Sequence, residues 1–151
     1  MKKFSNTPII YLANPYTHKS KKVMRERYLK VDKAAAHLFK LGVMTYPPIA
    51  LNARWTKYED FGHSWEAWEA YDKNFLERCD GLLVLMLDGW EKSVGVQSEI
   101  DYARELGIPI GYVTFEDVMN DDIDGVFNLV GDIVKRESQK PSWPKCVRIF
   151  R

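Results

Sequence analysis

An acidic residue, Asp72, interrupts the apolar face of a helix that the sequence predicts from residue 64 to about residue 78. The apolar side chains of this segment recur at spacings of three and four, which places them on one helical face: Trp65, Trp68, Phe75 and Cys79. Asp72 has the same spacing and is predicted to point inward with them. Because a carboxylate that faces a core is costly unless it is paired, hydrogen-bonded or protonated, this placement indicates a specific role.

A second acidic residue, Glu99, has the same position on the next predicted helix. It falls between Val96 and Ala103 on the apolar face, again at spacings of three and four residues. Two inward carboxyl groups on neighbouring helices form a candidate catalytic site. The pattern also fits a structural role, in which each acid caps backbone groups or pairs with an arginine, and the spacing alone does not decide between these interpretations.

A pair of carboxyl groups suits the cleavage of a glycosidic bond. One of them attacks or stabilises the anomeric carbon, and the other delivers a proton to the leaving group. The transition state resembles an oxocarbenium ion, so an ionised glutamate nearby stabilises it. Apolar surroundings raise the pKa of a carboxyl group and can keep the second acid protonated near neutral pH.

The two helices belong to a pattern in which short apolar segments alternate with longer amphipathic ones. The short segments predict strands at residues 8–13, 43–46, 81–87 and 108–114. The longer segments predict helices at residues 19–41, 64–78, about 94–107 and 126–136. This alternation is typical of an α/β fold, and we expect a flavodoxin-like or Rossmann-like three-layer sandwich with a parallel sheet of about five strands.

Parallel α/β sheets bind their ligands at the carboxyl ends of the strands. The segments that follow the predicted strands are therefore the ones to consider: residues 14–19, 47–63 and 88–99. Pro47 and Pro48 end the second strand, and residues 49–63 are expected to form an irregular loop that acts as a lid or a binding wall. The C-terminal residues 141–151 are expected to add an edge strand.

Size and charge restrict the class of protein. The chain has 151 residues, 46% of them apolar, which suffices for the core of a single domain over residues 1–151. Its 22 basic residues nearly balance 21 acidic ones, which argues against a nucleic-acid polymer or a membrane as the partner and favours a small molecule. Cys79 and Cys146 show neither zinc-ligand spacing nor a disulfide framework, and the N-terminal apolar run is too short for a signal peptide. We expect a cytoplasmic protein without a metal.

Three segments resemble the nucleoside 2-deoxyribosyltransferase-like superfamily. They are YLANPY (residues 11–16), YDKNFLERCD (residues 71–80) and SVGVQSE (residues 93–99), and the resemblance runs from about residue 9 to residue 114. The superfamily includes transferases that exchange bases and hydrolases that act on deoxynucleoside 5′-monophosphates. The resemblance implies cleavage of an N-glycosidic bond through a covalent intermediate on Glu99, with assistance from Asp72 and with Tyr11 in contact with the nucleophile and the sugar.

One position in the resemblance favours a phosphorylated substrate. The transferases usually have an aspartate six residues before the catalytic glutamate, whereas the nucleotide hydrolases have a serine, as Ser93 is here. The Ser93 hydroxyl, the backbone around Gly95 and the N-terminus of the following helix together suit a phosphate group. Asn14 stands where a glycine is common in the superfamily, and it is a candidate substrate contact.

Other candidate contacts rest on weaker signals. Residues 15–19 replace the basic glycine-rich loop of the hydrolases, which leaves Lys19 or His18 as a candidate for the phosphate, although both residue types are usually solvated. Of the tryptophans, most are expected in the core or in a subunit interface. Trp90, in the loop before Ser93, is the one expected to stack on a base.

The resemblance leaves the outcome of the reaction open. It implies no metal or organic cofactor, and it implies a homo-oligomer, a dimer or larger, in which a neighbour closes the pocket. The alternatives to hydrolysis are base exchange between nucleosides and a nucleotide-sensing module that binds without reacting. A receiver-like signalling domain fits poorly, because Asn14 stands where such a domain has an acidic cluster.

Overall fold

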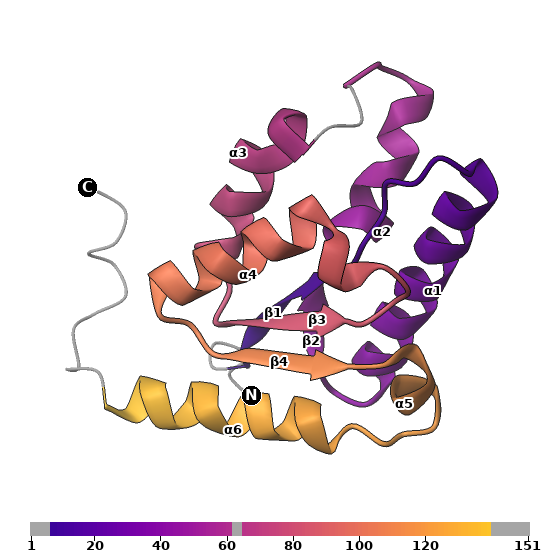
Figure 1. Cartoon of the computed structure of the whole chain (residues 1–151). Helices are drawn as coiled ribbons and strands as arrows, with labels where there is room; N and C mark the ends of the chain where they lie inside the picture. Colours follow the sequence, from indigo (N-terminus) through magenta and orange to yellow (C-terminus); the bar gives the residue numbers. More distant parts are fainter. Residues whose placement is uncertain (1–6, 62–64, 140–151) are drawn as a thin grey trace.

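The centre of the molecule is a sheet of four parallel strands, seen in a computed structural model that describes residues 7–61 and 65–139 (Figure 1). The strands are β1 (Ile9–Ala13), β2 (Met44–Tyr46), β3 (Gly81–Leu85) and β4 (Ile110–Val113). Their order is β2-β1-β3-β4. The expected α/β fold, with its flavodoxin-like three layers, is confirmed, with four strands in the described part of the chain instead of about five. The tail expected to form an edge strand lies outside it.

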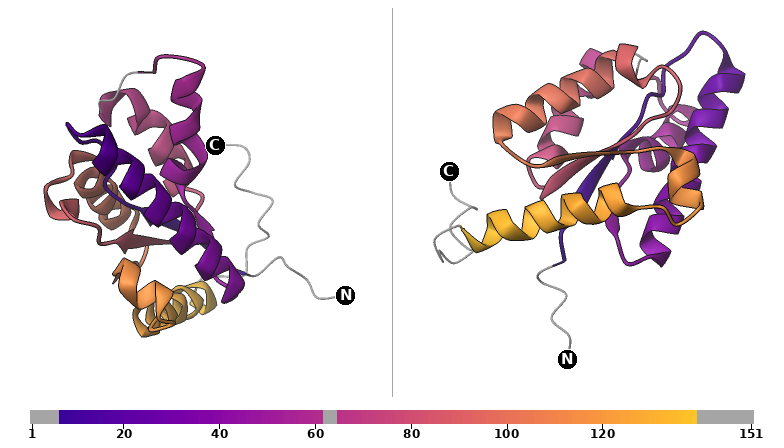
Figure 2. Two further views of the ribbon diagram at one scale, coloured as in Figure 1. Left: turned by 90° about the vertical axis from the view of Figure 1, so that its right-hand side faces the viewer. Right: turned by 60° about the horizontal axis from the view of Figure 1, so that its bottom comes forward.

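Helices cover both faces of the sheet. One face carries α1 (Lys21–Lys40), α5 (Phe115–Met119) and α6 (Asp124–Ser138), and the other carries α3 (Trp65–Leu76) and α4 (Val94–Leu106). Figure 2 shows α4 and α6 on opposite sides of the strands. The four helices and four strands predicted from periodicity are present, with each end within two residues of its predicted position.

The alternation of side chains along β1 decides which face holds the candidate site. Ile10 and Leu12 pack into the core under α1 and α6, whereas Tyr11 and Ala13 pack into the core under α3 and α4. Tyr11 is fully buried, and it shares its face with the two helices that carry the inward acids. The period of two in the strand therefore brings Tyr11 to the same side as Asp72 and Glu99.

The segment after β2 differs from the prediction. An irregular loop was expected at residues 49–63, but the chain forms α2 (Pro48–Asn52) and the 3₁₀-helix η2 (Ala53–Lys57). Pro48 occupies the first helical position, where a missing N–H costs nothing, so the same proline that ends the strand also starts a helix. This wall of the pocket is ordered backbone, which holds Asn52 in a buried position.

Candidate functional site

A pocket of about 790 Å³ opens at the carboxyl ends of β1 and β3. These strands are neighbours, but the chain leaves β1 toward α1 on one face and leaves β3 toward α4 on the other. Such a point in the strand order separates the two following loops and leaves a crevice between them. A short 3₁₀-helix, η3 (Trp90–Lys92), lies in the second loop. Asn14, Ser93 and Gly95, all expected as substrate contacts, line this pocket.

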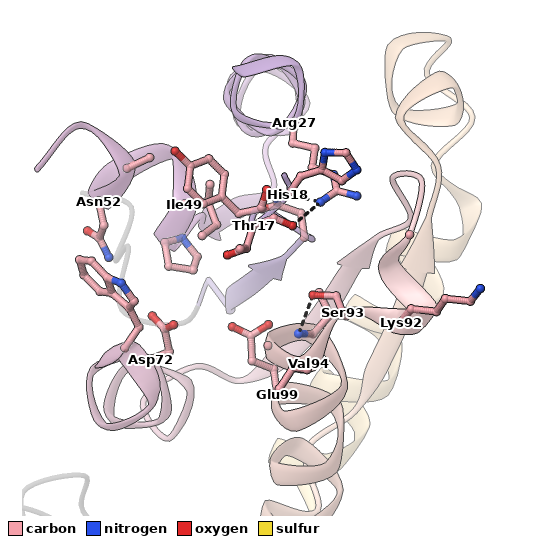
Figure 3. A pocket seen from close by; sticks show the side chains of 18 of the residues that line it. Thr17, His18, Arg27, Ile49, Asn52, Asp72, Lys92, Ser93, Val94 and Glu99 are labelled. Atoms are coloured by element: carbon pink, nitrogen blue, oxygen red, sulfur yellow. Dashed lines mark hydrogen bonds between the residues drawn. The ribbon is translucent and has the colours of Figure 1, made fainter. Parts of the chain in front are cut away.

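Both predicted acids face the pocket from the α3–α4 side. Asp72 and Glu99 line it, and each residue is only 6% exposed. Figure 3 shows their carboxyl groups turned toward the same space. The Tyr11 hydroxyl donates a hydrogen bond of 2.6 Å to Oε1 of Glu99. The inward orientation that helical periodicity predicted for both acids is confirmed, and no arginine pairs with either of them among the ion pairs of the described residues.

Burial changes the acidity of this cluster. It raises the pKa of Asp72 to about 7 and the pKa of Glu99 to about 8, and the negative charge of Asp72 raises the pKa of Glu99 further. Contact with the Tyr11 hydroxyl acts in the opposite direction on both acids. Burial and the two acids together keep the pKa of Tyr11 well above its usual range, so its phenol stays neutral. Near neutral pH the pair of carboxyl groups therefore holds about one proton.

The polar end of the pocket is built around the start of α4. Ser93 caps this helix, since its Oγ accepts a hydrogen bond of 3.4 Å from the backbone N–H of Val96. The Ser93 hydroxyl still has its hydrogen to donate, and the N-terminus of a 13-residue helix favours an anion. Lys92, just before the cap, also lines the pocket. Ser93, Gly95 and the N-terminus of α4, the groups expected to bind a phosphate, therefore lie together at this end of the pocket.

An arginine that the sequence reading missed joins this polar end. Arg27, on α1, donates to the backbone carbonyl groups of Thr17 at 3.0 Å and of Asp88 at 2.6 Å. It thereby links the loop after β1 to the loop after β3, and its guanidinium group lines the pocket beside His18 (Figure 3). The sequence did not predict this role for Arg27, because an arginine on an amphipathic helix usually lies in solvent.

The opposite end of the pocket is apolar and aromatic. Pro48 and Ile49 of α2 line it together with Trp68 of α3. Behind them, Tyr46 stacks on Phe75 with ring centroids 4.4 Å apart and planes 6° from parallel. Trp68 was predicted on the apolar face of its helix and, like most of the tryptophans, was expected in the core or in a subunit interface. It is the tryptophan that this end of the pocket offers to a flat ligand.

Two expected contacts lie elsewhere. Trp90 was expected to stack on a base, but it packs against Tyr112 of β4, with ring centroids 5.6 Å apart, and does not line the pocket. The 3₁₀-helix η3 turns it toward β4 and leaves Lys92 and Ser93 on the pocket side. Lys19 was a candidate for the phosphate, yet it lines a separate depression beside Met24 of α1. Arg27 and Lys92 are cationic residues that line the pocket, and Figure 3 shows the Lys92 amine turned away from the two acids.

Two further features of the described residues bear on the kind of site. Over residues 7–61 and 65–139, no three His, Cys, Asp or Glu side chains gather in a way that could hold a metal ion. The helices in these same ranges are too short or too polar to cross a membrane. The side chains that line the pocket present carboxyl, hydroxyl, amide and guanidinium groups to a ligand.

Comparison with known families identifies the chain. A family model described as "Domain of unknown function (DUF1937)" matches residues 8–114. The chain belongs to the DUF1937 family. The matched DUF1937 segment contains all four strands, Tyr11, both inward acids and the start of α4. No protein among those with curated functions matches the chain.

Proposed function

We propose that this protein cleaves the N-glycosidic bond of a nucleoside or deoxynucleoside 5′-monophosphate, with Glu99 as the attacking carboxylate. The observation that carries the proposal is the buried Glu99–Tyr11 hydrogen bond beside Asp72, in a pocket large enough for a nucleotide. The resemblance of three segments to the nucleoside 2-deoxyribosyltransferase-like superfamily supports the same assignment.

The two ends of the pocket suggest how the nucleotide lies. The phosphate fits the polar end, near Arg27, Lys92 and Ser93, and the base fits the apolar end, near Ile49 and Trp68. Figure 3 shows Glu99 between Asp72 and Ser93. The sugar, which connects base and phosphate, would then place its anomeric carbon over the Glu99 carboxylate.

The shared proton of the two acids fits the first half of the reaction. In the free protein burial gives Glu99 the higher pKa, about 8 against about 7 for Asp72, so the shared proton lies mainly on Glu99. For the reaction this proton moves to Asp72, because the positive charge that develops at C1′ and the hydrogen bond donated by Tyr11 both stabilise an ionised Glu99. An oxygen of Glu99 attacks C1′, the C1′–N bond breaks, and its electron pair leaves with the base, which takes the proton from Asp72. The products of this step are a glycosyl ester of Glu99 and the free base.

Water completes the cycle in the second half. Asp72, now ionised, takes a proton from a water molecule, whose oxygen attacks C1′ and displaces the Glu99 carboxylate. The sugar phosphate leaves, and the pair again holds one proton. If a second base takes the place of the water, the same glycosyl intermediate gives base exchange. The identity of the acceptor, water or a base, therefore decides between hydrolysis and transfer, and Glu99 is the nucleophile in both.

Release of free base tests the proposal. The protein is incubated with a panel of nucleosides and nucleoside 5′-monophosphates, with and without an acceptor base, and free base is measured by chromatography. We expect Glu99→Gln to lower kcat/KM by at least about a thousandfold, because it removes the nucleophile. Glu105→Gln is the matched control, since Glu105 lies exposed on the same helix.

Two results would contradict the proposal. Free base that appears equally fast with Glu99→Gln would remove Glu99 from the reaction. Nucleotide that binds tightly to the intact protein without any release of base would instead indicate a sensing module.

A further inference from the structure

A second hollow, of about 790 Å³, is lined by the loop after β1, the first turns of α1 and the 3₁₀-helix η2. We call it the basic depression, because five residues with basic side chains line it: His18, Lys19, Lys21, Arg54 and Lys57. No acidic side chain of the described residues lines it. The chain as a whole has 22 basic and 21 acidic residues, so this excess of positive charge is local.

The cations of the basic depression lack acidic partners within the described part of the chain. None of the ion pairs there includes Lys19, Lys21, Arg54 or Lys57. Lys21 begins α1, whose first turn contains no acidic residue, although acids are favoured at this end of a helix. Like charges around one hollow repel one another, and an anion with several charges relieves this repulsion. The basic depression therefore suits a small polyanion.

The basic depression borders the pocket that holds the two acids. Five residues line both hollows: Tyr16, Thr17, His18, Ala53 and Thr56. A ligand whose sugar lies at Glu99 can therefore extend across this border and bring further charged groups to the basic depression.

His18 stands at the border on the side of the first phosphate. Figure 3 shows it beside Arg27, which belongs to the polar end of the pocket. Its Nδ1 accepts a hydrogen bond of 3.0 Å from the backbone N–H of Ser20. The neutral imidazole ring therefore carries its hydrogen on Nε2, which leaves this N–H as a donor for a phosphate oxygen.

We propose that the basic depression binds the phosphate groups beyond the first, so that the preferred substrates are nucleoside 5′-diphosphates and 5′-triphosphates. The inference rests on the proposed function, because the placement of the first phosphate near Arg27 directs the chain of phosphates. The second phosphate passes His18, and the third lies among Lys19, Lys21 and the basic residues of η2. Each phosphate adds negative charge and acceptor oxygens, which the ammonium and guanidinium groups bind through charge-assisted hydrogen bonds.

Nucleotides that differ only in the number of phosphates test this preference. The mono-, di- and triphosphate of the deoxynucleoside whose base is released fastest are compared in a buffer without divalent cations, so that the triphosphate keeps its full charge. We expect kcat/KM to be at least about tenfold higher for the triphosphate than for the monophosphate, and the difference to shrink as salt is added. Equal values, or a preference for the monophosphate, would overturn the inference even though cleavage itself had been demonstrated.

Charge reversal tests whether the basic depression makes the selection. In the double variant Arg54→Glu/Lys57→Glu, the ratio of kcat/KM for triphosphate to that for monophosphate should fall at least about fivefold. Lys33→Glu/Lys40→Glu is the matched control, because it changes the net charge equally at exposed positions toward the other end of α1. Lys19→Glu/Lys21→Glu gives the same comparison if the first variant fails to fold. A ratio that stays unchanged in a folded variant of the basic depression would overturn the inference.

Binding separates this inference from the proposed function. Calorimetric titration of Glu99→Gln protein with the mono- and triphosphates of the four common deoxynucleosides measures the preference without any reaction. Tighter binding of a triphosphate that is lost with Arg54→Glu/Lys57→Glu supports the inference, even if the wild-type protein releases no base and the proposed chemistry fails. Equal binding of mono- and triphosphates, no binding of either, or tighter binding of a single-stranded oligodeoxynucleotide than of any triphosphate overturns it.

Discussion

At the scale of single residues, the central feature is a pair of carboxyl groups buried beside one phenol. Burial raises the cost of ionising both acids, the negative charge of Asp72 adds to this cost for Glu99, and the Tyr11 hydroxyl lowers it for Glu99 through a direct hydrogen bond. The result is a pair that keeps one proton at neutral pH. A retaining glycosidase needs this state, in which one carboxylate attacks while one carboxylic acid protonates the leaving base.

The same burial should make the stability of the protein depend on pH. Folding raises the pKa of Asp72 from 3.8 to about 7 and the pKa of Glu99 from 4.5 to about 8. Between about pH 4 and pH 8 the native state therefore holds protons that the unfolded chain has lost, and the free energy of unfolding falls as the pH rises. We expect Glu99→Gln to be more stable than the wild type at pH 8.5, by roughly 1–3 kcal/mol, because it removes a buried charge.

Thermal unfolding at several pH values checks this expectation. The gain from Glu99→Gln should shrink as the pH falls and should be lost near pH 4, where both forms of the protein carry a neutral group at this position. Glu105→Gln, on the exposed surface of α4, should show no such trend. A Glu99→Gln variant that is less stable than the wild type at every pH would show that the carboxylate is held by strong favourable contacts and is a structural residue.

At the scale of elements, two loops form the site, and Arg27 joins them. Its guanidinium group donates to carbonyl groups of the loop after β1 and of the loop after β3. The Arg27 side chain lies close to the backbone of Gly89, which has a φ of +88°. A Cβ atom on this residue would lie 2.9 Å from Nη2 of Arg27. Glycine is suited to this position both for its backbone conformation and for the space it leaves. Arg27 thus holds together the loops on which Asn14 and Ser93 lie.

A substitution of Arg27 should separate its contribution to phosphate binding from its contribution to loop structure. With Arg27→Met we expect KM for a nucleoside 5′-monophosphate to rise at least about tenfold, because a guanidinium–phosphate contact is lost, while KM for the corresponding nucleoside changes little. Arg25→Met, an exposed position on the same helix, is the control. Equal increases of KM for nucleotide and nucleoside would mean that Arg27 only shapes the loops.

The sequence predicted the elements more completely than the contacts between them. Periodicity identified Asp72 and Glu99, because a polar residue in an apolar stripe is visible along a single helix. Arg27 was missed because its contacts depend on where the two neighbouring loops lie in space. Trp90 was misplaced for the same reason, since η3 directs it toward Tyr112 of β4.

At the scale of the whole molecule, the strand order determines where the pocket forms. The order β2-β1-β3-β4 places β1 and β3 side by side at the centre, and their following helices cover opposite faces of the sheet. The alternation along β1 then puts Tyr11 under α3 and α4. The DUF1937 match, residues 8–114, spans this whole arrangement and ends before α5 and α6. The candidate site therefore lies within the part of the chain that defines the family.

A covalent glycosyl ester on Glu99 is the species that the whole account requires. It can be trapped with the 2′-fluoroarabino analogue of whichever nucleotide the protein cleaves best, because fluorine beside the anomeric carbon destabilises the oxocarbenium-like transition state of hydrolysis. Mass spectrometry of the intact protein and of its peptides measures the adduct. We predict one added sugar phosphate, on the peptide that contains Glu99, and no adduct with Glu99→Gln. An adduct on another residue, or cleavage of the nucleotide with no adduct at Glu99, would contradict the account.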